Sequence, residues 1–192
     1  PYSDITCLEA INLIGKNIVQ AVNDPSEENY DALMFSGMLA GIGFGNAGCH
    51  LPHGMSYAVA GLVKDYQPDG WPADHAMVPH GISVIVNSPA VFRKTGPACP
   101  ERHWEAADAM GADLTDKNME DGGEILADQI ISMMRETGIP NGLSGVGYSM
   151  SDIDALTDRS FAQKRLIDNG PLPISRIELK ELLPFVYLSN LT

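Results

Sequence analysis

The sequence predicts an all-α fold, a helical bundle of seven or eight helices, and three observations support this prediction. Apolar residues recur every three or four positions along most of the chain, as they do on the buried face of a helix. Residues that favour helix starts and ends separate these segments. Strand patterns are nearly absent, since the β-branched run 84–86 lies inside a helical repeat. With 192 residues, the chain is long enough to form one domain spanning 1–192.

The first half of the chain carries signals for four helices. Ser3 is placed to cap a first helix, whose inward-facing apolar stripe begins at Ile5. A second helix is predicted over residues 26–48. A third and a fourth follow Pro52 and Pro79, because proline is favoured in the first turn, where its missing N–H costs no hydrogen bond.

The second half continues the helical pattern. Residues 100–110 predict a short helix and residues 115–137 a long one. Ser151 and Asp154 have the spacing of a capping box, which begins a further helix. Pro89 interrupts an apolar pattern, so we expect it to kink or split its helix.

Composition excludes several classes of partner. The chain has 25 acidic and 12 basic side chains, a net charge of -13, so we expect no nucleic acid and no anionic membrane surface as partners. No apolar run approaches the roughly 20 residues of a membrane span. Three widely spaced cysteines indicate reduced thiols, as in the cytoplasm, or the mitochondrial matrix for a eukaryotic source. The start at Pro1, without Met or a signal peptide, indicates a piece of a longer protein.

Glycines recur every fourth residue in the second predicted helix, at Gly37, Gly41 and Gly45. Each glycine inside a helix costs up to about 1 kcal/mol relative to alanine. One explanation is close helix packing on a face of small residues. The other is that the backbone must approach a ligand or metal cavity. The sequence leaves both open.

Two histidines occur in the same tripeptide, Pro-His-Gly, at His53 and His80. In each case the histidine falls in the first turn of a predicted helix, where the positive end of the helix dipole disfavours imidazolium. Neutral imidazole is the form that binds metals, so the pair is a candidate metal site. The alternative is two hydrogen-bonded core histidines. A metal needs at least three protein ligands; His50 could share a face with His53, whereas we expect His75 in a loop and His103 solvated on a surface helix.

The motif around these histidines resembles a known family. Residues 41–57, Gly-Ile-Gly-Phe-Gly-Asn-Ala-Gly-Cys-His-Leu-Pro-His-Gly-Met-Ser-Tyr, together with Val-Pro-His-Gly at 78–81, are similar to the C-terminal helical domain of the iron-containing, or group III, alcohol dehydrogenases. Residues 100–113 and 146–149 resemble its hydroxyacid–oxoacid transhydrogenase branch. The resemblance covers essentially the whole chain.

The resemblance implies a site shared with residues outside this sequence. Family members hold Fe(II), sometimes Zn, with one Asp and three His, and bind NAD(P) in an N-terminal Rossmann-like domain. His53 and His80 match two ligands; the other two belong to an Asp-x-x-x-His motif on a preceding helix, which this sequence lacks. Tyr57 stands where many members have a second histidine, and it either relays a proton or only lines the site. Phe44 either lines the substrate side or belongs to the core.

The implied activity is hydride transfer between an alcohol or hydroxyacid and NAD(P), with 4-hydroxybutyrate and 2-oxoglutarate as the substrate pair in the transhydrogenase branch. Anionic substrates need a cationic subsite, and Lys64 and Arg93 are the basic residues closest to the motif in sequence. Two other classes remain open, a helical metal-dependent hydrolase and a non-catalytic helical interaction domain. The 192 residues alone are expected to lack activity, to hold neither metal nor NAD(P) tightly, and to form a homodimer through a bare apolar face.

Overall fold

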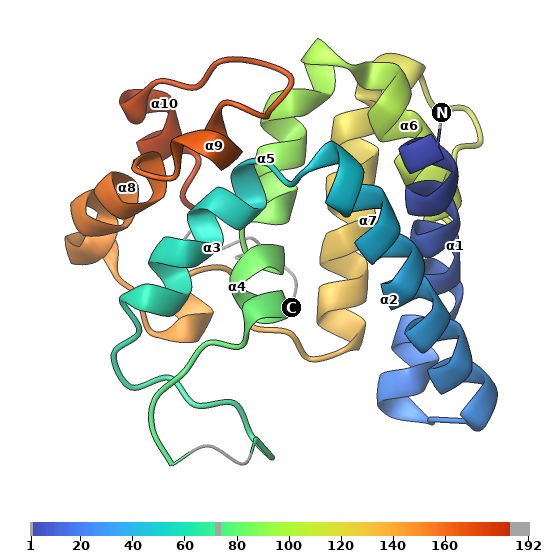
Figure 1. The fold of residues 1–192 in the computed structure, drawn as a ribbon, viewed down its shortest axis with the longest axis horizontal. Coiled ribbons are helices and arrows are strands. Elements are labelled where there is room, and N and C mark those ends of the chain that lie inside the picture. Colours follow the sequence, from blue (N-terminus) through green and yellow to red (C-terminus); the bar gives the residue numbers. More distant parts are fainter. Residues whose placement is uncertain (1, 72–73, 185–192) are drawn as a thin grey trace. The chain divides into compact units, whose positions relative to one another are not determined.

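The computed structural model describes residues 2–71 and 74–184, and this part of the chain is helical with no strand (Figure 1). Seven of its ten α-helices have eight residues or more, so the predicted all-α class is confirmed. In chain order the helices are α1 (Tyr2–Asn23), α2 (Glu27–Ala47), α3 (Leu51–Gly61), α4 (His80–Ile85), α5 (Ser88–Thr95), α6 (Pro100–Ala109), α7 (Gly122–Glu136), α8 (Ile153–Phe161), α9 (Lys164–Ile167) and α10 (Arg176–Glu181). Short 3-10 turns lie between some of them, at Gly96–Ala98, Met119–Asp121, Ser144–Val146 and Met150–Asp152.

The chain gathers into two compact units and passes between them after Cys49, Val91 and Gly138. The first unit contains α1, α2, α6, α7 and the end of α5, and the second contains α3, α4, α8, α9, α10 and the start of α5. No single helix among the described residues is long and apolar enough to cross a membrane, although α2 and α3 together pass that test on length and composition.

In the first unit, α1 runs along α2, and α6 packs on α7 (Figure 1). The predicted second helix is confirmed, because the Ser26 side chain accepts a hydrogen bond from the backbone N–H of Asn29 and Gly48 ends the helix. At the crossing of α1 and α2, a Cβ on Gly43 would collide with the Cys7 sulfur. A larger residue there would therefore push the two helices apart.

In the second unit, α3 is the central helix and contacts α4, α8 and α9, while α8 also contacts α10. Its side chains Leu51, Met55 and Val59 are fully buried. These residues lie four apart, so one face of α3 forms the centre of the core. Burying a side chain of this size contributes about 1.5–3 kcal/mol to stability.

Several local predictions differ from the structure. Ser3 lies within α1, which already begins at Tyr2, and Ile5 is 72% exposed. The long helix predicted from residue 115 begins only at Gly122, because Asp116 adopts a left-handed φ of 57° that a helix cannot continue through. Pro89 does split its helix, as predicted, between α4 and α5.

The capping box predicted at Ser151 and Asp154 occurs two residues earlier. Ser149 and Asp152 exchange the two reciprocal hydrogen bonds there. Asp154 instead accepts a 2.6 Å bond from Lys180 on α10, which the sequence spacing does not reveal.

The glycine repeat of α2 does not mediate close helix packing within the described part of the chain. A Cβ on Gly37, Gly41 or Gly45 would have no described atom within 4 Å. The packing explanation therefore fails for these three positions and holds only for Gly43. The same face of α2 also exposes Met34 (77%), which the sequence places one turn before Met38 (53%).

Candidate metal centre

The two Pro-His-Gly histidines lie side by side in the second unit. His53 is in the first turn of α3, which has Pro52 at its start, and His80 is the first residue of α4, directly after Pro79. Their ring centres are 5.3 Å apart, and the ring planes are tilted by 56°. The structure thus brings together two side chains that are 27 residues apart in sequence, by the numbering of the chain.

This spacing fits two ligands of one ion. Two imidazoles bound through nitrogen at about 2.0–2.1 Å to a tetrahedral ion would place their ring centres roughly 5 Å apart. The observed 5.3 Å agrees with that value. Burial, and then the nearby His80, lower the pKa of His53, which favours the neutral form that can bind a metal.

Two serines outside the predicted site residues hold the two histidine turns in the same way. Ser56 Oγ donates a 2.7 Å hydrogen bond to the backbone carbonyl of His53, and Ser83 Oγ donates an equal bond to that of His80. Both serines are buried, at 2% and 0% exposure. The sequence does contain a signal for these serines, because the repeated motif is Pro-His-Gly-x-Ser and not only Pro-His-Gly.

Within the described residues, the candidate metal site consists of two histidines. No group of three or more His, Cys, Asp or Glu side chains close enough to hold a metal occurs within residues 2–71 and 74–184. His50 precedes α3 as its N-cap and lies outside such a group. His75 lies in an exposed loop beside Asp74, as predicted. The two histidines could therefore provide two of the four ligands of a tetrahedral site.

The prediction for His103 is wrong. It is only 7% exposed and lies in the first unit, where α6 meets the end of α5. Its Nε2 is 2.8 Å from the Thr95 hydroxyl, and its Nδ1 is 3.0 Å from the backbone carbonyl of Cys99. One neutral tautomer satisfies both contacts, with Nδ1 donating and Nε2 accepting. The ring also meets Phe92 edge-on, so His103 fixes the start of α6.

The two other residues singled out by resemblance lie in different units. Tyr57 follows His53 by four residues on α3, hence on the same side of that helix, and is 50% exposed. Phe44 is near the end of α2 in the first unit and is 52% exposed, which excludes the core alternative within the described chain.

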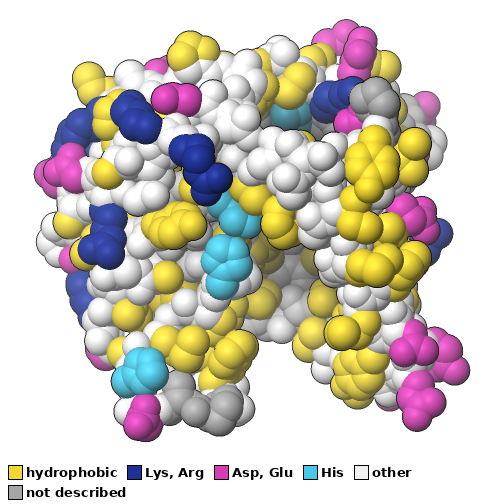
Figure 2. All heavy atoms as spheres, in the orientation of Figure 1, with side chains coloured by type: hydrophobic (Ala, Val, Ile, Leu, Met, Phe, Trp, Pro, Cys, Tyr) yellow, Lys and Arg dark blue, Asp and Glu magenta, His cyan; other side chains and the backbone are white. Residues whose placement is uncertain are grey.

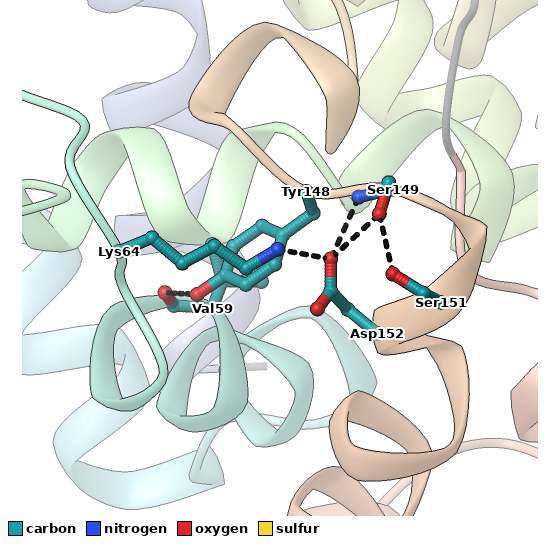
Figure 3. A network of polar contacts seen from close by, with 6 residues as sticks. All are labelled: Val59, Lys64, Tyr148, Ser149, Ser151 and Asp152. Carbon is teal, nitrogen blue, oxygen red and sulfur yellow. Dashed lines mark hydrogen bonds and ion pairs between the residues drawn. The ribbon is translucent and has the colours of Figure 1, made fainter.

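Neither basic residue considered for an anionic substrate is an isolated cation. Lys64 Nζ lies 2.6 Å from Asp152 and 5.9 Å from the centre of the Tyr148 ring (Figure 3). Asp152 also accepts bonds from Ser149, and this network lowers the pKa of its carboxyl, with Lys64 as the largest cause. Arg93 contacts Glu124 at 2.8 Å and Asp128 at 2.6 Å.

The Tyr148 hydroxyl stabilises the C-terminal end of α3, the helix that carries His53 in its first turn. It donates a 2.6 Å hydrogen bond to the Val59 carbonyl, which lies in the last turn of α3 and has no partner further along the helix (Figure 3). Burial, and then Asp152, raise the pKa of Tyr148 to about 12. The phenol is therefore protonated at neutral pH and acts as a helix cap.

Comparisons with known proteins find relatives over nearly the whole chain. The family model for "Fe-containing alcohol dehydrogenase family, C-terminal" matches residues 1–187. Hydroxyacid-oxoacid transhydrogenase, mitochondrial, from Xenopus laevis is 43% identical over 183 residues, and the human protein of that name is 42% identical. These alignments cover 95% of this chain but only 40% and 39% of the relatives. The crystal structure of a 1,3-propanediol oxidoreductase superposes with a TM-score of 0.83 at 25% identity, covering 95% of this chain and 44% of that one.

Proposed function

Because the chain belongs to the iron-containing alcohol dehydrogenase family, as its C-terminal helical region, we propose that it forms the metal-binding part of an NAD(P)-linked oxidoreductase. The observation that carries the proposal is the His53–His80 pair, 5.3 Å apart at the starts of two helices. We propose that these two side chains hold one divalent ion, Fe(II) or Zn, together with ligands from outside the described residues.

Each nearby side chain has a distinct part in this proposal. When bound, the ion supplies Lewis acidity that favours loss of the hydroxyl proton of an alcohol. His53 and His80 present neutral nitrogens, and Ser56 and Ser83 fix the turns from which they project. Tyr57 follows His53 by one helical turn, and we propose that its hydroxyl hydrogen-bonds the substrate oxygen or passes on its proton. A nicotinamide cofactor held by the rest of the protein would supply the hydride acceptor for the substrate carbon.

The substrate proposal follows the relatives. We propose a hydroxyacid such as 4-hydroxybutyrate as the hydride donor and a 2-oxoacid such as 2-oxoglutarate as the acceptor, with the nicotinamide reduced and reoxidised in turn. Identity of 43% over 183 residues to a protein named hydroxyacid-oxoacid transhydrogenase supports this pair. The chain spans about two fifths of that relative's length. For a eukaryotic source we propose the mitochondrial matrix as the location, and the word "mitochondrial" in the names of these relatives supports a mitochondrial location.

The chain by itself is proposed to be inactive and to bind metal weakly. Two imidazoles leave most of an ion's coordination to water, and no described carboxylate joins them to balance its charge. We also propose that isolated chains self-associate through α2. Figure 2 shows apolar side chains gathered over this helix, and Tyr30, Met34 and Met38, spaced four apart, are each more than half exposed.

The test combines metal content with turnover in the whole protein that carries this chain. His53→Gln and His80→Gln should each lower bound iron or zinc per protein and abolish NAD(P)-linked oxidation of 4-hydroxybutyrate. His75→Gln is the matched control, because His75 is an exposed loop histidine. Full metal content and turnover in both variants would overturn the proposal. A hydrolase or an interaction domain would show no nicotinamide-dependent change in absorbance at all.

A further inference from the structure

The second unit has six basic side chains, and three of them are paired with protein carboxylates. Lys64 pairs with Asp152 at 2.6 Å. On α10, Arg176 pairs with Asp158 at 2.7 Å and Lys180 with Asp154 at 2.6 Å. A carboxylate ligand would have to displace a protein carboxylate at each of these three positions.

The remaining basic side chains are Arg159, Lys164 and Arg165. The Arg159 guanidinium lies against the end of α3, where a Cβ on Gly61 would come within 2.6 Å of it. Lys164 and Arg165 form the first half of α9 and are both exposed. Within the described residues, neither is in an ion pair with a carboxylate; Lys164 instead lies 3.4 Å above the Phe161 ring, a contact that leaves its charge intact.

The helix that carries this basic pair, α9, packs against the first turn of α3, which holds His53. A Cβ on Gly54, the residue after His53, would lie 3.0 Å from Ile167 and 3.4 Å from Leu166. Both apolar residues of α9 are buried, at 1% and 7% exposure, which anchors the helix there. Figure 2 shows histidine side chains near the starts of α3 and α4, with a basic side chain over α9 directly beside them.

We propose that Lys164 and Arg165 of α9 form the anion subsite of this centre and bind the carboxylate of a hydroxyacid whose hydroxyl reaches the His53–His80 pair. The inference rests on the proposed function and adds the residues that distinguish an acidic from a neutral alcohol. A guanidinium and an ammonium suit a carboxylate through charge-assisted hydrogen bonds. Gly54 is the structural device that lets α9 approach closely enough.

The kinetic test compares two alcohols that differ only in their charge, 4-hydroxybutyrate and 1,4-butanediol, in the whole protein. Lys164→Gln with Arg165→Gln should lower kcat/KM for the acid about tenfold or more, mainly through KM, and leave the value for the diol unchanged. The control is Arg176→Gln with Lys180→Gln, which removes the same two charges from α10 and should leave both values unchanged. An equal loss for acid and diol, or no loss, would overturn the proposal. A rise in KM for NAD(P) instead of the acid would overturn it too, because it would assign α9 to the cofactor phosphates.

A binding test separates this inference from the proposed function. In the ¹⁵N-labelled 192-residue chain, 4-hydroxybutyrate should shift the backbone amides of Arg165 and Leu166, and high salt should remove the shift. The diol should not shift them. Such shifts without any turnover in the whole protein would refute the proposed function and keep the subsite. Turnover of the acid with no shifts at α9, and no effect of the α9 variant, would refute the subsite and keep the function.

Discussion

Replacing Tyr148 with phenylalanine removes one hydroxyl from the second unit and nothing else. The ring is 4% exposed and keeps its place in the core, whereas the 2.6 Å hydrogen bond to the Val59 carbonyl is lost. That carbonyl lies in the last turn of α3, where the helix itself offers no donor. A buried acceptor left without its partner costs about 1–3 kcal/mol. We therefore expect Tyr148→Phe to lower the free energy of unfolding by that amount at neutral pH.

The same variant changes how stability depends on alkaline pH. The pKa of Tyr148 in the folded chain is about 12, above its ordinary value of 10.0. The folded state therefore holds the phenol proton more tightly than the unfolded state does. This contribution is present in full below the ordinary pKa of 10.0 and is lost as the pH rises towards 12. Phenylalanine has no such proton, so the variant should lose less stability over this range than the wild type.

Urea unfolding followed by circular dichroism at neutral and alkaline pH measures both effects. Tyr30→Phe is the matched control, because Tyr30 is 53% exposed on α2 and should show neither effect. If Tyr148→Phe matches the wild type in both stability and alkaline response, the hydroxyl does not cap α3 and the reasoning fails.

Three further predictions concern helix packing and the histidine pair. Gly43→Ala should destabilise the chain by about 1–3 kcal/mol, because the added methyl meets the Cys7 sulfur. Gly41→Ala, whose added methyl would have no described atom within 4 Å, should stabilise the chain by up to about 1 kcal/mol. Urea midpoints of the two variants that move in the same direction would contradict this. Met55→Ala, at a fully buried position, should cost about 2–5 kcal/mol in the same assay, and a loss below 1 kcal/mol would show that α3 is not central to the core. In the metal-free chain, His53 should titrate by NMR below its ordinary pKa of 6.5, and His80→Ala should raise that pKa only in part, because burial is the larger cause; a pKa above 6.5 would be the wrong sign.

The features predicted correctly depend on residues close in sequence. Ser26 and Gly48 predict the two ends of α2 correctly, because a helix cap depends only on its neighbours within one turn. The paired Pro-His-Gly starts are local signals of the same kind, and they placed His53 and His80 at helix starts. The resemblance of residues 41–57 and 78–81 then supplied the family, which the family model confirms.

The features that local patterns missed depend on contacts with other elements of the fold. Lys64 pairs with Asp152, which is 88 residues away in sequence, and no local sequence pattern predicts that ion pair. His103 has the sequence of a surface helix, but Thr95 and Phe92 on the preceding helix bury it. The sequence does not indicate the proposed α9 subsite, because the packing of α9 against the first turn of α3 depends on the tertiary contact at Gly54.

The central claim is that His53 and His80 bind one ion together. Anomalous scattering from crystals of the whole protein, grown with iron or zinc and measured at the metal absorption edge, tests it most directly. We predict one peak within bonding distance, about 2.0–2.1 Å, of a ring nitrogen of both histidines. A peak that touches only one of them, or that lies elsewhere while their rings remain 5.3 Å apart, would contradict the claim.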